Sequence, residues 1–248
     1  MTAHSKPTEG HELGRPNAFD GFALPTSNTT YTPNQFFDVC LPHRSRGVVR
    51  LVAYLIRKTL GWSDAYGNPQ QEVIAVSYVE LERKAGLSHS MIRRALDEAE
   101  RSHLIRCKRK GVASSRTQSG TSAAYELLWD EQGVFVKNPA EFRGFFAGEG
   151  NRTYVPNQFF DHVVRHEPLA VVQVVGSVIR FSIGFQTRYG HRRQRTALSY
   201  RDIQRYAKIS SPTVVSGAIR TALANQYIER VERGYFDPRG GTFSRSAH

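Results

Sequence analysis

The chain carries the stretch Asn-Thr-Thr-Tyr-Thr-Pro-Asn-Gln-Phe-Phe-Asp at residues 28–38 and repeats it as Asn-Arg-Thr-Tyr-Val-Pro-Asn-Gln-Phe-Phe-Asp at residues 151–161. The two tyrosines, Tyr31 and Tyr154, stand 123 positions apart. The same spacing aligns Ile-Arg-Lys-Thr-Leu-Gly-Trp, which ends at Trp62, with Ile-Arg-Phe-Ser-Ile-Gly-Phe further along the chain. Two related copies of about a hundred residues predict two similar domains in one chain.

Composition suggests where the two copies begin and end. Residues 1–27 are rich in Gly, Pro, Ser, Thr and His and poor in apolar side chains, which predicts a flexible tail. We place the first domain at 28–130, a linker at 131–150 and the second domain at 151–248. The linker mixes Gly and Pro with phenylalanines, so we expect it to pack against a domain. A chain of 248 residues is long enough for two separate cores.

The charge balance is strongly basic. There are 34 Lys and Arg against 22 Asp and Glu, which gives a net charge of +12. The second half is the more basic, since residues 131–248 hold 17 Lys and Arg and 9 Asp and Glu, against 17 and 13 in residues 1–130. Such a balance favours a polyanionic partner, of which nucleic acid is the commonest. A basic but inert surface is the alternative.

The first domain begins with a long helix and continues toward a helical pair. Apolar residues at spacings of three and four predict the long helix over 48–60. Residues 72–76 have short β character. Ser77, with Glu80 three positions on, predicts a capped helix that runs to about Ala85.

A second helix and a hairpin complete the first domain. Ser88 is expected to cap this helix, whose face with Ile92 and Leu96 must be buried. Strands are expected to begin over 104–107 and to return over 123–128, on either side of a basic loop. Two helices joined by a tight turn and followed by a hairpin are the winged-helix order, a mainly α fold with small β-hairpins (α+β).

The second domain follows the same order. In sequence, we expect a long helix over 169–183, a short strand over 196–198, a helix over 199–208, a second helix from 212, a strand over 227–231 and a hairpin loop over 232–245. Ser199, with Asp202 in the capping-box position, begins the first of the paired helices. Pro212 stands in the first turn of the next, where its missing N–H costs nothing.

These motifs together resemble the N-terminal DNA-binding domain of the phage replication protein O family and related plasmid and phage replication initiators. In the first copy the resemblance covers residues 31–110 and is carried by Pro33, Asn34, Phe37, Asp38, Arg57, Lys58, Gly61 and Trp62. It implies a winged-helix fold and binding to repeated sites at a replication origin. The second copy departs from the pattern, with Phe181, Ser182 and Phe185 in place of Lys, Thr and Trp. The family's domain typically occurs once per chain, and here it occurs twice.

Base-reading candidates lie in the N-terminal half of each second helix, which enters the major groove in helix-turn-helix proteins. They are His89, Ser90, Arg93 and Arg94 in the first copy and Ser211, Thr213, Ser216 and Arg220 in the second. An arginine can donate two hydrogen bonds to guanine. The alternative is that Arg93 and Arg94 only touch phosphate or pair with Asp97 and Glu98 on their own helix. The face in the second copy is almost uncharged at its start and would use short polar contacts or DNA shape.

Phosphate contacts are expected from cations in the hairpins and in one loop. The candidates are Lys108, Arg109, Lys110 and Arg116 in the first hairpin, Arg188, Arg192, Arg193 and Arg195 in the loop before the short strand of the second copy, and Arg230, Arg233 and Arg239 in the second hairpin. Arg239 precedes two glycines and is our candidate for the minor groove. For the loop cluster, a merely solvated loop is the alternative.

Other chemistry finds little support in the sequence. Cys40 and Cys107 form no Cys-x-x-Cys pair, so neither a zinc site nor a disulfide scaffold is predicted. His162 and His166 have no third ligand nearby, so we interpret them as incidental surface histidines. Phosphate-binding-loop and nucleophile-elbow motifs are absent, so we expect no enzyme, no cofactor and no metal. We interpret the repeated Pro-Asn-Gln-Phe-Phe-Asp motif as structural, with its phenylalanines in the core beneath the long helix.

These observations predict a sequence-specific double-stranded DNA-binding protein whose two winged-helix modules bind a bipartite site. A replication initiator or origin-binding protein of a plasmid, phage or other mobile element is the first hypothesis, in a bacterial cytoplasm with no membrane span. The alternatives are a transcriptional regulator at promoters and a protein–protein adaptor in replication, partition or recombination. Replication proteins are possible further partners. The sequence leaves open whether the chain is a monomer or a homodimer, and whether the half-sites are direct or inverted.

Overall fold

The computed structural model describes Phe19 and residues 21–22, 27–62, 64, 69–114, 119–231, 236–237 and 242–243. Helices and small antiparallel sheets alternate along these residues, so the chain has a mixed α+β fold, as the sequence predicts. We call residues 28–130 the first repeat and residues 151–248 the second repeat.

The first repeat contains a long helix, a helical pair and a three-stranded sheet. Its elements are β1 (Thr29–Pro33), the π-helical segment η1 (Phe36–Cys40), α1 (Leu41–His43), α2 (Arg46–Thr59), β2 (Val73–Val76), α3 (Tyr78–Glu80), the π-helical segment η2 (Leu81–Ala85), α4 (His89–Arg101), β3 (Ile105–Arg109) and β4 (Ala123–Leu127). The strands pair in the order β2-β4-β3, all antiparallel. The predicted helices and strands of this repeat are confirmed, and α4 buries Ile92 and Leu96 as expected.

The second repeat has the equivalent long helix and helical pair, with fewer strand residues among those that the structure describes. Its elements are β5 (Arg152–Pro156), the π-helical segment η3 (Phe159–Val164), α5 (Leu169–Phe181), α6 (Tyr200–Ala207), α7 (Pro212–Ala224), β6 (Phe236–Asp237) and β7 (Thr242–Phe243). Strands β6 and β7 pair with each other in the predicted hairpin region. Most of the remaining hairpin residues lie outside the described part of the chain.

Serines occupy the N-cap positions of several of these helices. Ser77 Oγ accepts a hydrogen bond from the Glu80 N–H at 3.1 Å, which caps α3. Ser199 and Asp202 form the complete capping box predicted for α6. Ser88 takes the N-cap position of α4, but its side chain makes no capping bond. The predicted start of α4 is therefore right, whereas the predicted capping role of Ser88 is wrong.

Two predicted strands of the second repeat are wrong. Within residues 196–198 only Ala197 has a β-bridge, and residues 227–231 contain no strand. The N–H groups of Tyr227 and Ile228 instead bond to the Ala222 carbonyl at the end of α7. A strand needs a partner strand to satisfy its backbone groups, and the described residues offer none here.

The linker packs against the first repeat, as expected. Phe142 and Phe145 are buried. The side-chain amide of Gln35 donates to the Val136 carbonyl at 2.8 Å and accepts from the Phe146 N–H at 2.6 Å. The connection between the repeats is therefore fixed to the motif at residues 28–38.

The two repeats meet through their copies of that motif. Strand β1 pairs with β5 in antiparallel fashion, with Tyr31 opposite Tyr154 at the centre of the register. Because these tyrosines occupy the same position in the two copies, a pseudo-twofold axis passes between them. Their rings stack with centroids 4.5 Å apart. We call the contact region around this axis the seam.

Polar contacts across the seam occur in reciprocal pairs. Thr153 Oγ1 donates to Asn34 Oδ1 at 2.7 Å, and Thr30 Oγ1 donates to Asn157 Oδ1 at 2.7 Å. The backbone N–H of each asparagine also donates across the seam, at 2.8 Å in both cases. Each asparagine therefore joins the two repeats, and the bond is made twice.

The motif phenylalanines join the two cores. The rings of Phe37 and Phe159 lie 6.0 Å apart, and those of Phe36 and Phe160 lie 6.1 Å apart. Buried side chains form one hydrophobic cluster that runs through both repeats. The expectation of two separate cores is therefore wrong, because the motif faces the other repeat. The interpretation of the motif as structural is confirmed, and the motif also joins the two repeats, which the sequence did not predict.

The long helices reach across the seam in the same reciprocal way. Arg50 Nε of α2 donates to the Val164 carbonyl at 3.0 Å, and the amide of Gln173 in α5 donates to the Leu41 carbonyl at 3.1 Å. Burial lowers the pKa of Arg50 to about 10, so the residue stays charged at neutral pH. These bonds satisfy carbonyls where η1 and η3 continue into the following turns.

Two ion pairs complete the seam. Arg180 forms a bidentate pair with Asp38, at 2.9 Å from Nε to Oδ1 and 3.1 Å from Nη2 to Oδ2. Its counterpart Arg57 makes a single contact with Asp161 at 3.2 Å. The first pair is the more buried of the two.

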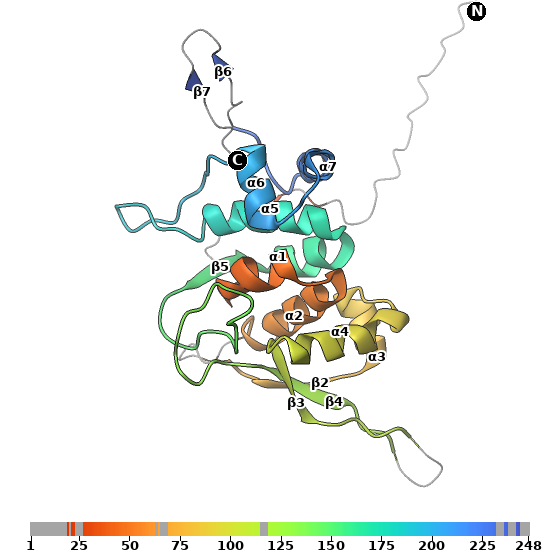
Figure 1. Ribbon diagram of the computed structural model, residues 1–248. Coiled ribbons are helices and arrows are strands. Elements are labelled where there is room, and N and C mark those ends of the chain that lie inside the picture. Colours follow the sequence, from red (N-terminus) through yellow and green to blue (C-terminus); the bar gives the residue numbers. More distant parts are fainter. Residues whose placement is uncertain are drawn as a thin grey trace, which may run out of the picture.

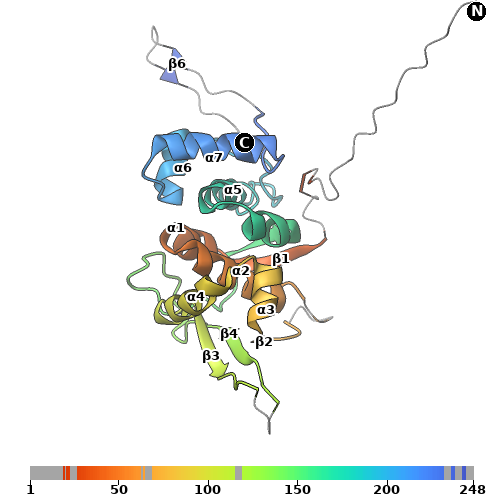
Figure 2. The same cartoon turned by 90° about the vertical axis from the view of Figure 1, so that its right-hand side faces the viewer.

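The seam sets the arrangement of the whole molecule. From top to bottom in Figure 1 the layers are α6 with α7, then α5, then α1 with α2, then α4, then the sheet of β2, β3 and β4. The β3–β4 hairpin and the β6–β7 hairpin point to opposite ends in Figures 1 and 2. The repeats are thus held as a pseudo-symmetric pair.

Candidate nucleic-acid interface

The two candidate recognition helices occupy equivalent places. Helix α4 packs on α2 of its own repeat, and α7 packs on α5. In Figure 2 the four helices follow one another as α7, α5, α2 and α4. The pseudo-twofold axis passes through the middle of this stack and relates α4 to α7.

The predicted base-reading residues of the first repeat are all exposed on α4: His89, Ser90, Arg93 and Arg94. Three of them are engaged within the repeat: His89 Nδ1 lies 2.8 Å from Glu82 Oε1, Ser90 Oγ lies 3.3 Å from Ser88 Oγ, and Arg93 Nε lies 3.3 Å from Asp97 Oδ1. Arg94 makes no hydrogen bond or ion pair with any residue that the structure describes. Its guanidinium is therefore the free donor group on this face.

The hairpin of the first repeat is partly neutralised by its own carboxylates. Lys108 Nζ lies 3.5 Å from Glu126 Oε1 on the paired strand. Arg109 and Lys110 are exposed and form no ion pair within the described residues. Arg116 lies outside the described part of the chain. The cations without an ion-pair partner in this hairpin, Arg109 and Lys110, therefore lie at the outer end of β3.

A groove of about 860 Å³ separates α4 from the hairpin. Arg93 and Lys110 line it together with Asp97 and Glu100. The carboxylates oppose an anion within the groove, so a phosphate would be favoured at its edges, near the free cations.

The corresponding face of the second repeat is less polar. Thr213 and Arg220 are exposed on α7, and Ser216 is half-buried. Ser211 accepts from the Val214 N–H, so its side chain caps the helix. Arg220 forms no ion pair with the described residues, whereas Val214 exposes 46 % of its surface. The prediction that this face is nearly uncharged at its start is confirmed.

The predicted hairpin cations of the second repeat fall mostly beyond the described residues. Arg233 and Arg239 lie outside them. Arg230 is half-buried, and its Nε is enclosed without a hydrogen-bond partner.

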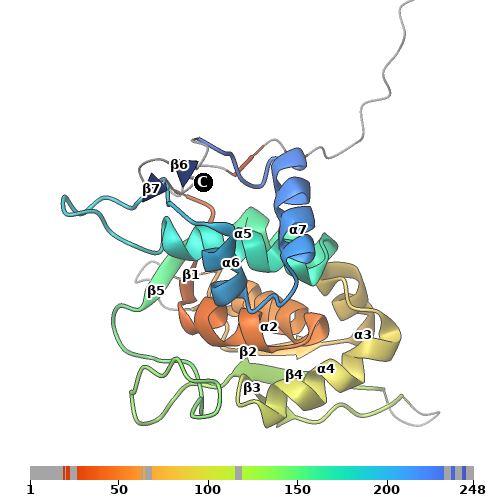
Figure 3. The same ribbon diagram turned by 45° about the horizontal axis from the view of Figure 1, so that its top comes forward.

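The loop between α5 and α6 carries the arginine cluster away from both recognition helices. Its cationic members are Arg188, Arg192, Arg193 and Arg195, and none forms an ion pair with a described residue. In Figures 1 and 3 this loop projects to the left, whereas α3, α4 and α7 lie to the right. The structure therefore does not bring the cluster together with the base-reading candidates.

The loop instead meets an aromatic row at the seam, which the sequence did not predict as a site. Arg192 lies over the Tyr154 ring at 5.7 Å, and Tyr154 stacks on Tyr31. Arg152 then lies between Tyr31 and Trp129, 5.4 and 5.1 Å from their centroids. Burial lowers the pKa of Arg152, and no described carboxylate pairs with it. The sequence signal for this site was the tyrosine that both copies share, because pairing of the two equivalent strands brings the two tyrosines face to face.

Metal chemistry has no geometric support among the described residues, which hold no group of three or more His, Cys, Asp or Glu side chains suited to an ion. The rings of His162 and His166 lie 5.5 Å apart, and Phe19 stacks on His162. Cys40 and Cys107 are free thiols. Burial raises the pKa of Cys40, which keeps this thiol protonated.

Comparison with known proteins gives no relative: no family model, curated protein or solved structure matches this chain. In the described part of the chain, no helix has both the length and the apolar character needed to cross a membrane.

Proposed function

We propose that the protein binds double-stranded DNA through two winged-helix modules, one in each repeat, as a replication initiator or origin-binding protein of a mobile element. The observation that supports this most is the presentation of α4 and α7 at equivalent places in a pseudo-twofold pair. The net charge of +12 favours a polyanionic partner. The replication role rests on the resemblance of residues 31–110 to the phage replication protein O family.

The pseudo-twofold axis gives the bound site its expected symmetry. Two recognition helices related by a twofold axis fit half-sites that are related in the same way, so the site is an inverted repeat. If both helices engage one face of the duplex, the half-site centres lie roughly 10 base pairs, or a multiple of that, apart. Because the seam fixes the two modules, the second contact is effectively intramolecular.

The two half-sites are not read alike in this proposal. Arg94 supplies a free guanidinium suited to a guanine edge. The equivalent position in α7 is Gly217, which has no side chain to make this contact. The first repeat therefore contributes most base specificity, and the second contributes shape and backbone contacts.

The test is selection from a random double-stranded library by the full chain, at two salt concentrations. An inverted bipartite motif whose affinity falls steeply with salt is the expected result, because several phosphates are contacted. The position of matching sites at origins or at promoters then separates an initiator from a transcriptional regulator.

A protein partner on α7 is the second candidate. Exposed Val214 and the near absence of charge at the start of α7 favour an adaptor contact for this module. Such a contact predicts a single short DNA motif, read by the first repeat alone. Partner binding at α7 would then be insensitive to salt, unlike DNA binding.

A further inference from the structure

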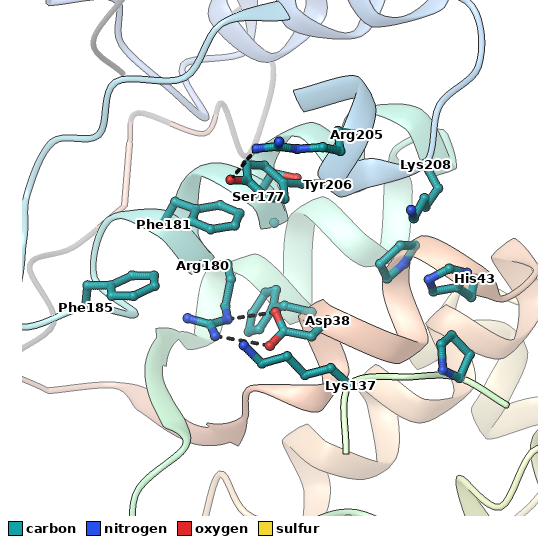
Figure 4. Close-up of a pocket in the computed structure, with 14 residues that line it drawn as sticks. Asp38, His43, Lys137, Ser177, Arg180, Phe181, Phe185, Arg205, Tyr206 and Lys208 are labelled. Carbon is teal, nitrogen blue, oxygen red and sulfur yellow. Dashed lines mark hydrogen bonds and ion pairs between the residues drawn. The ribbon is translucent and has the colours of Figure 1, made fainter. Parts of the chain in front are cut away.

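A cavity of about 470 Å³ opens between the two repeats, next to the Asp38–Arg180 ion pair (Figure 4). Helix α1 and the linker line one side of it, and α5 and α6 line the other. The pseudo-twofold axis carries this place onto the Arg57–Asp161 pair. There the corresponding cavity has only about 20 Å³. The pocket is thus a feature of one half of a molecule whose halves are otherwise alike.

Side chains at equivalent positions explain why only one cavity is open. Tyr54 of the first repeat stands where the second repeat has Ser177, and its hydroxyl donates to Glu80 Oε1 at 2.6 Å. Arg165 fills the rest of the closed cavity, since its guanidinium crosses to a backbone carbonyl of η2. Its equivalent beside the open pocket is the shorter Pro42.

The open pocket has an excess of positive charge. Lys137, Lys208 and Arg205 line it as cations, and the imidazole of His43 lines it as well. Lys137 and Lys208 form no ion pair within the described residues. His43 has a lowered pKa because of burial and because Lys208 is close. The one carboxylate in the lining, Asp38, is already held by Arg180.

An aromatic wall faces Lys208 and His43. The rings of Phe181 and Tyr206 lie 4.0 Å apart, and Phe185 stacks on Phe181 at 6.0 Å. Figure 4 shows Phe181 and Phe185 on one side of the pocket, with Lys208 and His43 on the opposite side. A ligand that uses both sides has a flat ring at one end and an anionic group at the other.

We propose that this pocket binds a nucleoside phosphate, with its base against Phe181 and Tyr206 and its phosphate groups near Lys208 and His43. Base stacking on aromatic side chains and phosphate pairing with lysine are the contacts that this chemistry needs. The volume lies within the ordinary range for small-molecule sites. The ligand is either a free nucleotide or an unpaired nucleotide of a strand. Neither source depends on the duplex binding proposed for α4 and α7.

Calorimetric titration of the full chain with ADP tests the pocket. We expect one site per chain, with adenosine and pyrophosphate each binding at least tenfold more weakly than ADP, because each lacks half of the contacts. An unpaired pentadeoxyadenylate serves as the second arm. Tighter binding of this strand than of ADP identifies a strand as the source, and the reverse identifies a free nucleotide.

Two variants locate the binding. Ser177→Tyr copies the residue that closes the other cavity, and should abolish ADP binding. Lys208→Gly copies Gly86 of the first repeat, removes a cation at the surface and should weaken ADP binding at least tenfold. Lys84→Ala removes one positive charge beside the closed cavity and is the matched control, with no expected change.

The proposal is overturned if neither ADP nor the strand binds at millimolar concentration. It is also overturned if binding persists unchanged in both pocket variants, or if pyrophosphate alone binds as tightly as ADP. Should Ser177→Tyr fail to fold, Lys208→Gly decides, because this exposed position already adopts a backbone conformation that suits glycine.

Discussion

The two repeats are alike where they touch each other and different where they face outward. At the seam they share the threonine–asparagine bonds, the paired phenylalanines and the arginine–aspartate pairs, each made twice. Away from the seam, the first half of α4 carries exposed arginines while the start of α7 presents Thr213 and Val214. At the edges of the seam, the cavities beside the two ion pairs differ more than twentyfold in volume. Each motif is therefore constrained by its partner, and the outer faces are free to take separate roles.

The two seam ion pairs should differ most in their contribution to stability. Arg180→Met should destabilise the protein by about 3 kcal/mol, because it leaves a nearly buried Asp38 unpaired. Arg57→Met should cost about 1 kcal/mol or less, since Asp161 is 54 % exposed and remains solvated. Urea denaturation of both variants measures the difference. Equal losses would show that the two halves of the seam are energetically equivalent despite their different burial.

The next effect concerns the arginines of α4. Arg94→Ala should weaken binding to the selected DNA by about 1–3 kcal/mol and relax specificity at one base pair. Arg93→Ala should cost less, because Arg93 is already paired with Asp97. Titration of each variant on the selected site and on single-base changes of it gives both quantities. An equal loss of affinity on every DNA sequence would show that Arg94 contacts phosphate and does not read a base.

The turns before α4 and α7 give a sharper comparison of the backbone. Gly86 and Lys208 both have positive φ, 69° and 56°. A Cβ at Gly86 would lie 2.4 Å from the Arg165 carbonyl oxygen, so Gly86→Ala should cost at least about 1–2 kcal/mol. Lys208→Ala should change the free energy of unfolding little, because Lys208 already adopts this conformation with a side chain. An unchanged free energy of unfolding in Gly86→Ala would mean that the backbone near Arg165 shifts to make room for the added Cβ.

A smaller effect is expected at the caps of the two recognition helices. Ser211→Ala should destabilise the protein by about 1 kcal/mol, because its Oγ accepts the Val214 N–H. Ser88→Ala should have almost no effect, since Ser88 makes no capping bond. Thermal unfolding of both variants measures the difference. A larger loss of stability in Ser88→Ala than in Ser211→Ala would contradict this prediction.

The smallest effect is a pH dependence shared by the repeats. Burial is the main cause that holds the pKa of His43 and of His166, which are equivalent positions, below the usual 6.5. The unfolded chain therefore binds more protons just below pH 6.5, and stability should fall as pH drops from 7 to 5.5. His43→Gln and His166→Gln should each flatten this dependence of the melting temperature. An unchanged slope in both variants would assign it to other groups.

The sequence predicted what local physics determines. Helix starts at Ser77, Ser199 and Pro212 were found correctly because capping and helical spacing act within a few residues. The strands at 196–198 and 227–231 were wrong because β character alone does not supply a partner strand. Local signals thus located the helical pairs, and the small sheets depended on the rest of the fold.

The seam was beyond such reasoning because it joins residues more than a hundred positions apart. The identical tyrosines could have suggested a self-pairing strand, but only the register shows that Tyr31 meets Tyr154. Arg152 was missed as a site residue because its importance comes from Trp129 and Tyr31, which are distant in sequence or on another strand. The arginine loop was correctly noted as a cationic cluster, yet only the structure separates it from α4 and α7.

The proposed function requires a pseudo-twofold pair of modules to bind a pseudo-symmetric DNA site. The most direct measurement is sequencing of double-stranded DNA selected by the full chain from a random library, repeated at two salt concentrations. The account predicts an inverted bipartite motif with fixed spacing, one half more sharply defined than the other, and recovery that falls with salt. A direct repeat, or no enrichment at either salt concentration, would contradict it.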